Sequence, residues 1–135
     1  MWVCNGRGAP PAGKAGGAAG VAARIRHAAT AALAEIGFSD SEFVGGVALA
    51  LSEAVGNVIQ HAYPNGAGDI DVSMLSNDHE IVITVADTGV GIDNAADSPG
   101  LGIGLQLIGR IATTWTISSD ASGTAITMRF ASPAR

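Results

Sequence analysis

The sequence lacks several features that would each point to a particular class of protein. It has one cysteine, Cys4, among 135 residues, so no internal disulfide can form, which fits a reducing cytoplasm. No apolar run approaches the ~18 residues that a membrane span needs. The N-terminus MWVCNGRG has neither the charged start nor the apolar block of a secretory signal. These absences predict a soluble, cytoplasmic protein that does not interact with a membrane.

Basic residues are also scarce. Lys and Arg together number 7 against 12 Asp and Glu, which gives a formal net charge of −5. No basic patch with interleaved aromatic residues is present, so we expect no direct contact with nucleic acid. No lysine follows Lys14. Any phosphate group bound at the Gly-rich segment, residues 99–108, must therefore be held by backbone amides and a metal ion.

The chain length predicts one domain, because 135 residues can bury a sizeable core but are too few for two such cores. Residues 5–20, NGRGAPPAGKAGGAAG, contain six glycines and two adjacent prolines, which predicts a flexible lead-in. We therefore divide the chain into a flexible N-terminal segment, residues 1–20, and one folded domain, residues 21–135.

Two segments in the first half of the chain show helical patterns. Residues 21–36, VAARIRHAATAALAEI, are rich in alanine, and Gly37 provides a stop. Ser39 followed three residues later by Glu42 is a capping-box signature for a second helix over residues 40–62.

A third helical segment is IGLQLIGRIA, residues 103–112. In all three segments the apolar residues recur at helical spacing and predict the face that packs into the core. These predicted core residues are Ile25, Ala29, Ala32 and Leu33 in the first segment, Phe43, Val47, Ala50, Leu51 and Val58 in the second, and Leu105, Ile108 and Ala112 in the third.

Four runs have the pattern of β-strands. Residues 69–75 and 80–87 flank the polar loop SNDH, which favours an antiparallel hairpin. TWTISS and TAITMRFA flank the turn DASG and predict a second hairpin. Helices and antiparallel strands thus alternate along the chain. This order predicts an α+β fold, a two-layer sandwich with a mixed or antiparallel sheet and the helices packed on one face.

The stretch SEAVGNVIQHAY, residues 52–63, carries Glu53, Asn57 and His61 at positions i, i+4 and i+8 of the second predicted helix. These side chains share one helix face, which is either a solvated stripe or one wall of a site. In a site, a carboxylate transfers a proton and an amide oxygen binds a hard cation such as Mg²⁺. We interpret His61 as a packed or capping residue, since no second His or Cys lies at metal-ligand spacing.

The stretch VADTGVGID, residues 85–93, places a carboxylate and two glycines at the end of a predicted strand. Asp87 is either a turn-forming residue or the acceptor of a hydrogen bond from an exocyclic amine such as that of adenine. In the second case, Gly89 and Gly91 let the backbone approach a flat ring closely.

Alternating glycines precede the third predicted helix in PGLGIGLQLI, residues 99–108. Gly100, Gly102 and Gly104 are poor residues for a first helical turn unless a ligand comes close to the backbone. Helix N-termini bind anions such as phosphates through unpaired N–H groups. The segment is neither a Rossmann fingerprint nor a P-loop, because no strand runs into it and GxxxxGK[ST] is absent. An ordinary loop is the alternative.

The order of these three motifs resembles that of the GHKL ATPases, which include the nucleotide-binding domains of DNA gyrase, a heat-shock chaperone, histidine kinases and mismatch-repair proteins. EAVGNVIQHAY corresponds to their N box, DTGVG to their G1 box and GLGIGL to their G2 box. The resemblance extends over about residues 21–131 and implies the Bergerat-type ATP-binding fold. It is greatest to the serine-protein kinase anti-sigma factors of bacterial stress and sporulation regulation, in which a helix of the form SEAxxNxxxHxY is typical. Histidine kinases are less similar, because no long helix with a phosphoacceptor precedes the motifs.

The resemblance implies ATP and Mg²⁺ as cofactors and assigns a role to each motif. Asn57 would coordinate Mg²⁺, and Glu53 would act as the base or orient the hydroxyl group of a protein substrate. Asp87 would bind the amino group of adenine. The other nucleotide contacts implied are Gly89 and Gly91 near the adenine ring, Gly100, Gly102, Ile103, Gly104 and Leu105 at the phosphates, and Thr124 beside Asp87 or a bridging water.

The family also implies partners. A member of this type phosphorylates a small anti-sigma-factor antagonist, binds a sigma factor and can form a homodimer. Three features depart from the family pattern. Residues 93–99, DNAADSP, are short for an ATP lid and contain no Arg or Lys, and no strand is readable ahead of the first helix. Finally, GLGIGL followed soon by a hairpin also resembles related switch kinases, which do not hold a sigma factor.

These departures leave two further functions open. The first is a nucleotide-gated regulator that binds ATP and partners but transfers little phosphate. The second is an ATP hydrolase in which Glu53 activates water, and the lack of a transducer domain weighs against it. The intact pair of Glu53 and Asn57 favours the kinase.

Overall fold

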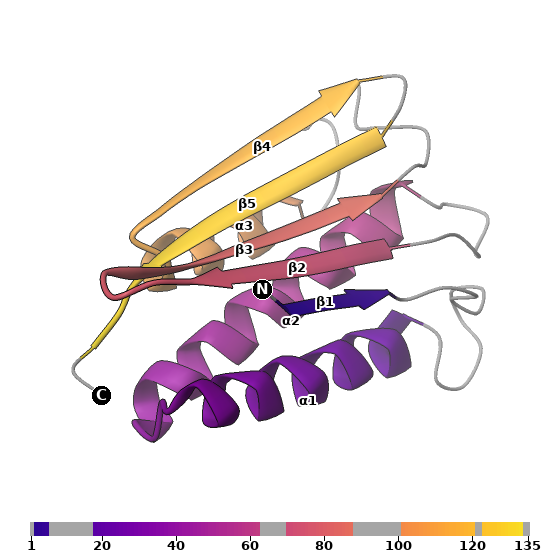
Figure 1. Cartoon of the computed structure of the whole chain (residues 1–135). Coiled ribbons are helices and arrows are strands. Elements are labelled where there is room, and N and C mark those ends of the chain that lie inside the picture. Colours follow the sequence, from indigo (N-terminus) through magenta and orange to yellow (C-terminus); the bar gives the residue numbers. More distant parts are fainter. Residues whose placement is uncertain (1, 6–17, 63–69, 88–100, 121–122, 134–135) are drawn as a thin grey trace.

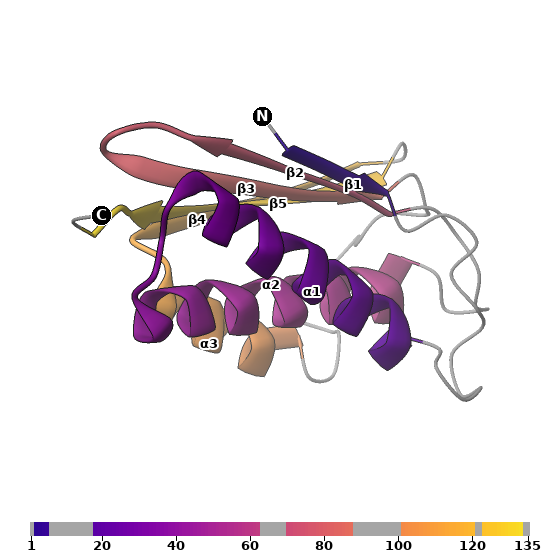
Figure 2. The same cartoon turned by 60° about the horizontal axis from the view of Figure 1, so that its bottom comes forward.

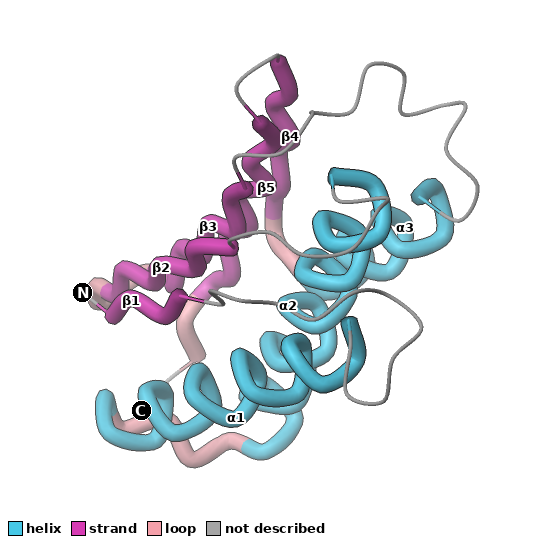
Figure 3. Tube along the Cα trace, turned by 90° about the vertical axis from the view of Figure 1, so that its right-hand side faces the viewer, coloured by secondary structure: helices cyan, strands magenta, loops and turns pink. Residues whose placement is uncertain are grey.

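The computed structural model describes residues 2–5, 18–62, 70–87, 101–120 and 123–133. In this part of the chain, three helices cover one face of a single sheet (Figures 1 and 2). The helices are α1 (Ala18–Ile36), α2 (Ser41–Ala62) and α3 (Leu101–Ile111). Viewed along the layers, the strands lie on one side and the helices on the other (Figure 3). The predicted α+β two-layer sandwich is confirmed.

Within the described ranges, the sheet has five antiparallel strands in the order β1-β2-β3-β5-β4. Both predicted hairpins are present, as β2 with β3 and as β4 with β5, and each strand lies within one or two residues of its predicted bounds. The strands are β1 (Trp2–Asn5), β2 (Ile70–Ser76), β3 (Glu80–Asp87), β4 (Thr114–Asp120) and β5 (Gly123–Ala131).

Strand β1 differs from the sequence-based expectation, in which no strand was readable ahead of the first helix. Trp2–Asn5 pairs antiparallel with β2, with Val3 opposite Ser73. A strand of four residues has too little alternation to be recognised locally, and its hydrogen bonds come from a segment about 70 residues away. Residues 6–17 lie outside the described residues, so the domain boundary at residue 20 stays a prediction.

The core lies between the sheet and the helices. Burial alternates along β3, where Ile81, Ile83 and Val85 are fully buried and the residues between them are partly exposed. A fully buried side chain of this kind contributes about 1.5–3 kcal/mol of hydrophobic free energy. Of the predicted helix-face residues with described side chains, all are buried except Phe43, which packs half-buried against the core.

The start of α2 is set by Asp40 and not by Ser39. The Asp40 Oδ1 atom accepts hydrogen bonds from the amides of Glu42 at 2.9 Å and Phe43 at 3.2 Å. These are the bonds that define an N-cap residue, so the predicted helix start is confirmed but its capping residue was wrong. Gly37 ends α1 with a φ of 116°, a left-handed conformation that favours glycine.

The helices and strands begin and end at two opposite ends of the molecule. At the Asp87 end, β3 and α2 end and β2 and β5 begin; at the Asp40 end, α2 begins and β5 and α3 end (Figure 1). No helix in the described ranges is long and apolar enough to cross a membrane.

Candidate functional site

Buried polar side chains gather at the Asp87 end. Among the described residues, the buried polar or charged residues are Asn57, Asp87 and Thr124, which are 6%, 7% and 2% exposed. They come from α2, β3 and β5, three elements that meet at this end of the molecule. A buried polar group costs free energy unless it is bonded, so such groups are uncommon without a reason. Asn57 and Asp87 belong to the sequence motifs, and Thr124 is a residue that the family resemblance implied.

Asp87 and Thr124 are neighbours on two adjacent strands, β3 and β5. Ala86 of β3 is opposite Ala125 of β5, so the next step of the antiparallel register puts Asp87 opposite Thr124. Directly opposite residues project from the same face of a sheet. Val85 and Ile126, two residues away on each strand, are buried under the helices, so Asp87 and Thr124 also face the helices.

Glu53 and Asn57 lie on the side of α2 that faces α3. The intervals of 7 and 11 residues from Gly46 are close to two and three helical turns, so the three residues share one side of the helix. Gly46 marks that side, because a Cβ atom placed there would lie 3.3 Å from Ile111 Cγ2 of α3. Asn57 is buried and Glu53 is half-buried. The motif therefore places Asn57 in the interior of the protein and Glu53 at its surface.

The Asn57 amide has unused hydrogen-bonding capacity. Its Nδ2 atom is buried and has no hydrogen-bond partner among the described residues. Leaving a buried donor unsatisfied costs about 1–3 kcal/mol. A 180° turn of the amide exchanges Nδ2 and Oδ1, so the same position offers an oxygen to a ligand.

This amide fits a magnesium ion that is held mainly by other groups. Mg²⁺ takes oxygen ligands and usually binds through one or two protein groups together with phosphates and water. Among the described residues, no group of three or more His, Cys, Asp or Glu side chains can hold a metal by itself. Asn57 would thus supply one ligand, and phosphate and water oxygens would supply the others.

The first turn of α3 provides backbone donors. Because α3 begins at Leu101, the residues from Gly102 to Leu105 lie at its N-terminus, where N–H groups have no partner within the helix. The helix ends at Ile111 beside Gly46, so its first turn points back toward the Asp87 end (Figure 2). This is the orientation in which the helix dipole favours a bound anion.

Several predicted residues lie outside the described residues. These are Gly89, Gly91, Gly100 and the lid segment, residues 93–99, together with the side chain of His61 in the last turn of α2. Their assigned roles stay predictions.

Gly46 is a residue that the sequence analysis missed. A side chain at this position would press on Ile111, so glycine permits the close contact of α2 with α3, the helices that carry Asn57 and the residues from Gly102 to Leu105. A signal was available, since Gly45 and Gly46 stand together inside a predicted helix. Glycine there costs about 1 kcal/mol relative to alanine, which suggests a packing reason.

Comparison with known proteins agrees with this arrangement. The family model described as the histidine kinase-like ATPase domain matches residues 18–130. The chain belongs to this family.

Curated relatives match over a shorter segment. The chain is 42% identical over 53 residues to an anti-sigma F factor of Clostridium acetobutylicum, covering 39% of this chain and 37% of that protein. It is 43% identical over 49 residues to an anti-sigma F factor of Bacillus licheniformis, covering 36% of this chain and 34% of that protein. The matched segment thus spans about a third of the length of these relatives.

Solved structures share the fold at lower identity. The RsbU and RsbW domains of a Mycobacterium tuberculosis protein match with a TM-score of 0.64 and 22% identity, over 100% of this chain and 34% of that one. The histidine kinase domain of a blue-light-activated kinase from Erythrobacter litoralis matches with a TM-score of 0.55 and 20% identity, over 84% and 60% of the two chains.

Proposed function

We propose that this protein is an ATP-binding serine/threonine-protein kinase of the anti-sigma factor type. It would phosphorylate a small anti-sigma-factor antagonist and thereby regulate a bacterial sigma factor in the cytoplasm, where ATP is available. One observation carries the proposal. The buried polar residues of the described chain are Asn57 and Asp87, which lie in the nucleotide-binding motifs, and Thr124, which the family resemblance implies as a nucleotide contact.

Each residue has a chemical role in this proposal. Asp87 accepts a hydrogen bond from the adenine amino group, and Thr124 flanks it on the neighbouring strand. Asn57 holds Mg²⁺ through its amide oxygen. The backbone amides at the start of α3 bind phosphate oxygens.

Glu53 has a separate role in phosphotransfer. Its carboxylate is half-buried, one helical turn before Asn57, and open to a second protein. It accepts the proton of the substrate serine hydroxyl or orients that hydroxyl for reaction. Bound ATP with Mg²⁺ supplies the phosphoryl group.

The partners in this proposal follow from the relatives and from the family resemblance. Two of these are anti-sigma F factors, and the matched segment includes only about a third of each. Their name supports a sigma factor as binding partner, while the antagonist protein as substrate and the homodimer as assembly are carried over from the family resemblance.

A second candidate function is a nucleotide-gated regulator that binds ATP but transfers little phosphate. It is favoured by residues 93–99, which contain no Arg or Lys that could neutralise charge on the transferred phosphoryl group.

Calorimetry of ATP binding tests the site. We expect the wild type to bind ATP and the affinity to fall strongly when Mg²⁺ is chelated, since no lysine follows Lys14. Asn57→Ala should remove most of that dependence on Mg²⁺, with circular dichroism as the check on folding. No ATP binding by the wild type at millimolar nucleotide would show that the site is wrong. An equal response to chelation in both proteins would rule out only the role of Asn57.

The kinase is tested by capture from the source cell with ATP and Mg²⁺, followed by detection of phosphoserine in the captured protein. We expect a small protein that gains phosphoserine in the presence of ATP. A captured partner that binds in an ATP-dependent way but never gains phosphate would favour the gated regulator.

A further inference from the structure

A second concave site lies at the Asp40 end of the molecule. It is a pocket of about 390 Å³ between the first turns of α2, the end of α3 and the end of β5. None of Glu53, Asn57, Asp87 and Thr124 lines it. It is therefore separate from the candidate nucleotide site and is assigned no role by the motifs.

The floor of this pocket is apolar. Val47 and Phe130 are buried at its base, with 1% and 2% of their surface exposed. Phe43 and Ile111 are partly buried and form its walls. Gly46 also lines the pocket, where α2 and α3 are in close contact.

The rim of the pocket is acidic. Asp40 and Glu42 line it, are exposed, and form no ion pair with another described residue. Two carboxylates of like sign attract a cation.

An anion is disfavoured here even though a helix begins at this rim. The amides of Glu42 and Phe43 bond Asp40 Oδ1, and the amide of Val44 bonds the Asp40 carbonyl oxygen at 3.0 Å. The N-terminal donors of α2 are thus already used by Asp40. A phosphate or carboxylate would meet two negative side chains and few free donors.

We propose that this pocket docks a segment of a partner protein that carries a large apolar residue next to an arginine or lysine. The apolar side chain would lie on Val47 and Phe130, and the cation would face Asp40 and Glu42. The volume is near the lower end of the range of about 300–1,000 Å³ for ligand sites, which suits one or two side chains. Adjacent residues of one chain place the two required groups a few ångströms apart.

The proposal does not depend on nucleotide binding and is tested without it. The full chain, labelled with ¹⁵N, is titrated with acetyl-Phe-Arg-amide while amide resonances are followed by NMR. We expect saturable shifts at Phe43, Gly46 and Thr113, which line the pocket. Acetyl-Phe-Glu-amide should bind about tenfold more weakly, because it places a third negative charge at the rim.

A charge-removing variant sharpens the test. Asp40→Asn combined with Glu42→Gln removes both rim charges, and asparagine caps helices as well as aspartate does, so folding should be preserved. This variant should bind both peptides with equal affinity. Asp71→Asn combined with Glu35→Gln removes the same net charge outside the pocket and should retain the preference for the arginine peptide.

Four results would overturn the proposal. The first is equal binding of the two peptides by the wild type, and the second is a preference for arginine that survives in the rim variant. The third is equally tight binding of free arginine amide, which would make the site one for small cations. The fourth is a dependence of the same resonances on protein concentration without peptide, which would make the occupant a second copy of the chain.

Discussion

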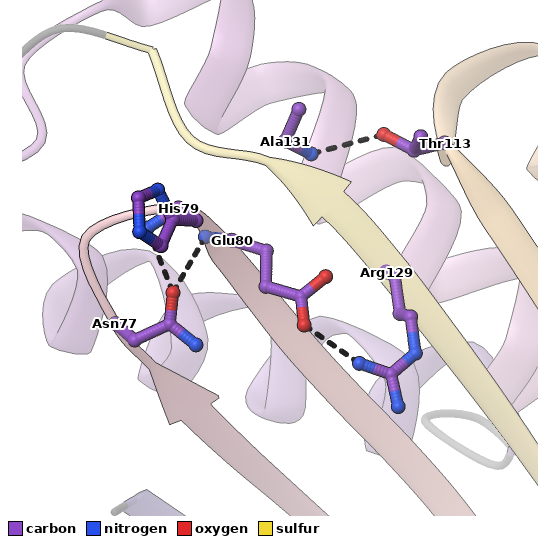
Figure 4. A network of polar contacts seen from close by, with 6 residues as sticks. All are labelled: Asn77, His79, Glu80, Thr113, Arg129 and Ala131. Atoms are coloured by element: carbon purple, nitrogen blue, oxygen red, sulfur yellow. Dashed lines mark hydrogen bonds and ion pairs between the residues drawn. The ribbon is translucent and has the colours of Figure 1, made fainter.

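Polar residues are buried at the Asp87 end of the molecule, whereas the residues that form polar contacts at the Asp40 end are exposed or half-buried. Asn57, Asp87 and Thr124 are enclosed between the sheet and the helices. The polar contacts at the other end join the β2–β3 turn, β5 and the residue before β4, and they are bonded within the chain (Figure 4).

The surface contacts at the Asp40 end complete the backbone of a turn. Asn77 Oδ1 accepts hydrogen bonds from the amides of His79 at 2.7 Å and Glu80 at 2.9 Å. The Glu80 Oε1 atom accepts a hydrogen bond of 2.7 Å from Arg129 Nη1 on the neighbouring strand. This network needs no other molecule.

Surface polar contacts and buried polar groups affect a protein in different ways. Surface polar contacts add modest stability, because water competes for the same groups. Buried polar groups lose their hydrogen bonds to water on folding, which costs free energy unless another group or a ligand replaces those bonds. Asn57 Nδ2, which has no partner among the described residues, is such a group. We therefore expect substitutions of the buried polar residues at the Asp87 end to change nucleotide binding, and substitutions of Asn77 or Glu80 in the surface network to change stability.

The largest expected effect is on phosphotransfer by Glu53→Gln. The two side chains have nearly equal size and similar helix propensity, so the fold and ATP binding should be preserved. Loss of general-base assistance should lower the rate of phosphotransfer by about 10²–10⁴-fold. The measurement is phosphoserine formation on the captured partner. An unchanged rate with normal ATP binding would remove Glu53 from the mechanism.

The next effect is on nucleotide affinity. Asp87→Asn can present an amide donor to the adenine amino group, so a charge-assisted hydrogen bond worth about 1.5–3 kcal/mol is lost. This loss corresponds to about 10- to 100-fold weaker ATP binding. Calorimetry measures it, with the unfolding midpoint as the control for a buried position. Unchanged ATP affinity in a folded variant would contradict the adenine contact.

A smaller effect is expected on stability from the Asp40 end. Asn77→Ala removes the acceptor of two backbone amides in the β2–β3 turn, which should lower the free energy of unfolding by about 1 kcal/mol. Asn77→Asp keeps an acceptor in the same place and is the matched control. Urea unfolding gives the difference, and ATP affinity should be the same in both variants. A change in ATP affinity would show that the β2–β3 turn and the nucleotide site are not independent.

The smallest effect should come from Glu80→Gln. The ion pair with Arg129 has side chains that are 33% and 49% exposed, so it is screened by water and salt. Its loss should cost about 0.2–1 kcal/mol, and the difference should shrink at high salt. Urea unfolding at low and high ionic strength provides the test. A salt-independent loss would point to packing of the side-chain stems as the cause.

Most of the regular structure was predictable because its signals are local. The helix faces that contain Ile25, Leu51 and Ile108 repeat every three or four residues, and β3 alternates with a period of two. These periods are set by backbone geometry within one element. The identity of the N-cap residue, Asp40 and not Ser39, was less predictable. Both residue types are good N-caps, and the two positions are adjacent in the chain.

The sequence by itself determined the site-residue types, since the motifs that contain Asn57 and Asp87 and the following Gly-rich segment are continuous in the chain. Only the tertiary structure decided which polar residues are buried, because Thr124 faces the helices beside Asp87 through a register that joins β3 to β5 across about 37 residues. The same holds for β1, which pairs with β2, and for the pocket that combines α2, α3 and β5. Spacing along a chain fixes the face of one element. Contacts between elements depend on strand register and on helix packing, which no short window of sequence contains.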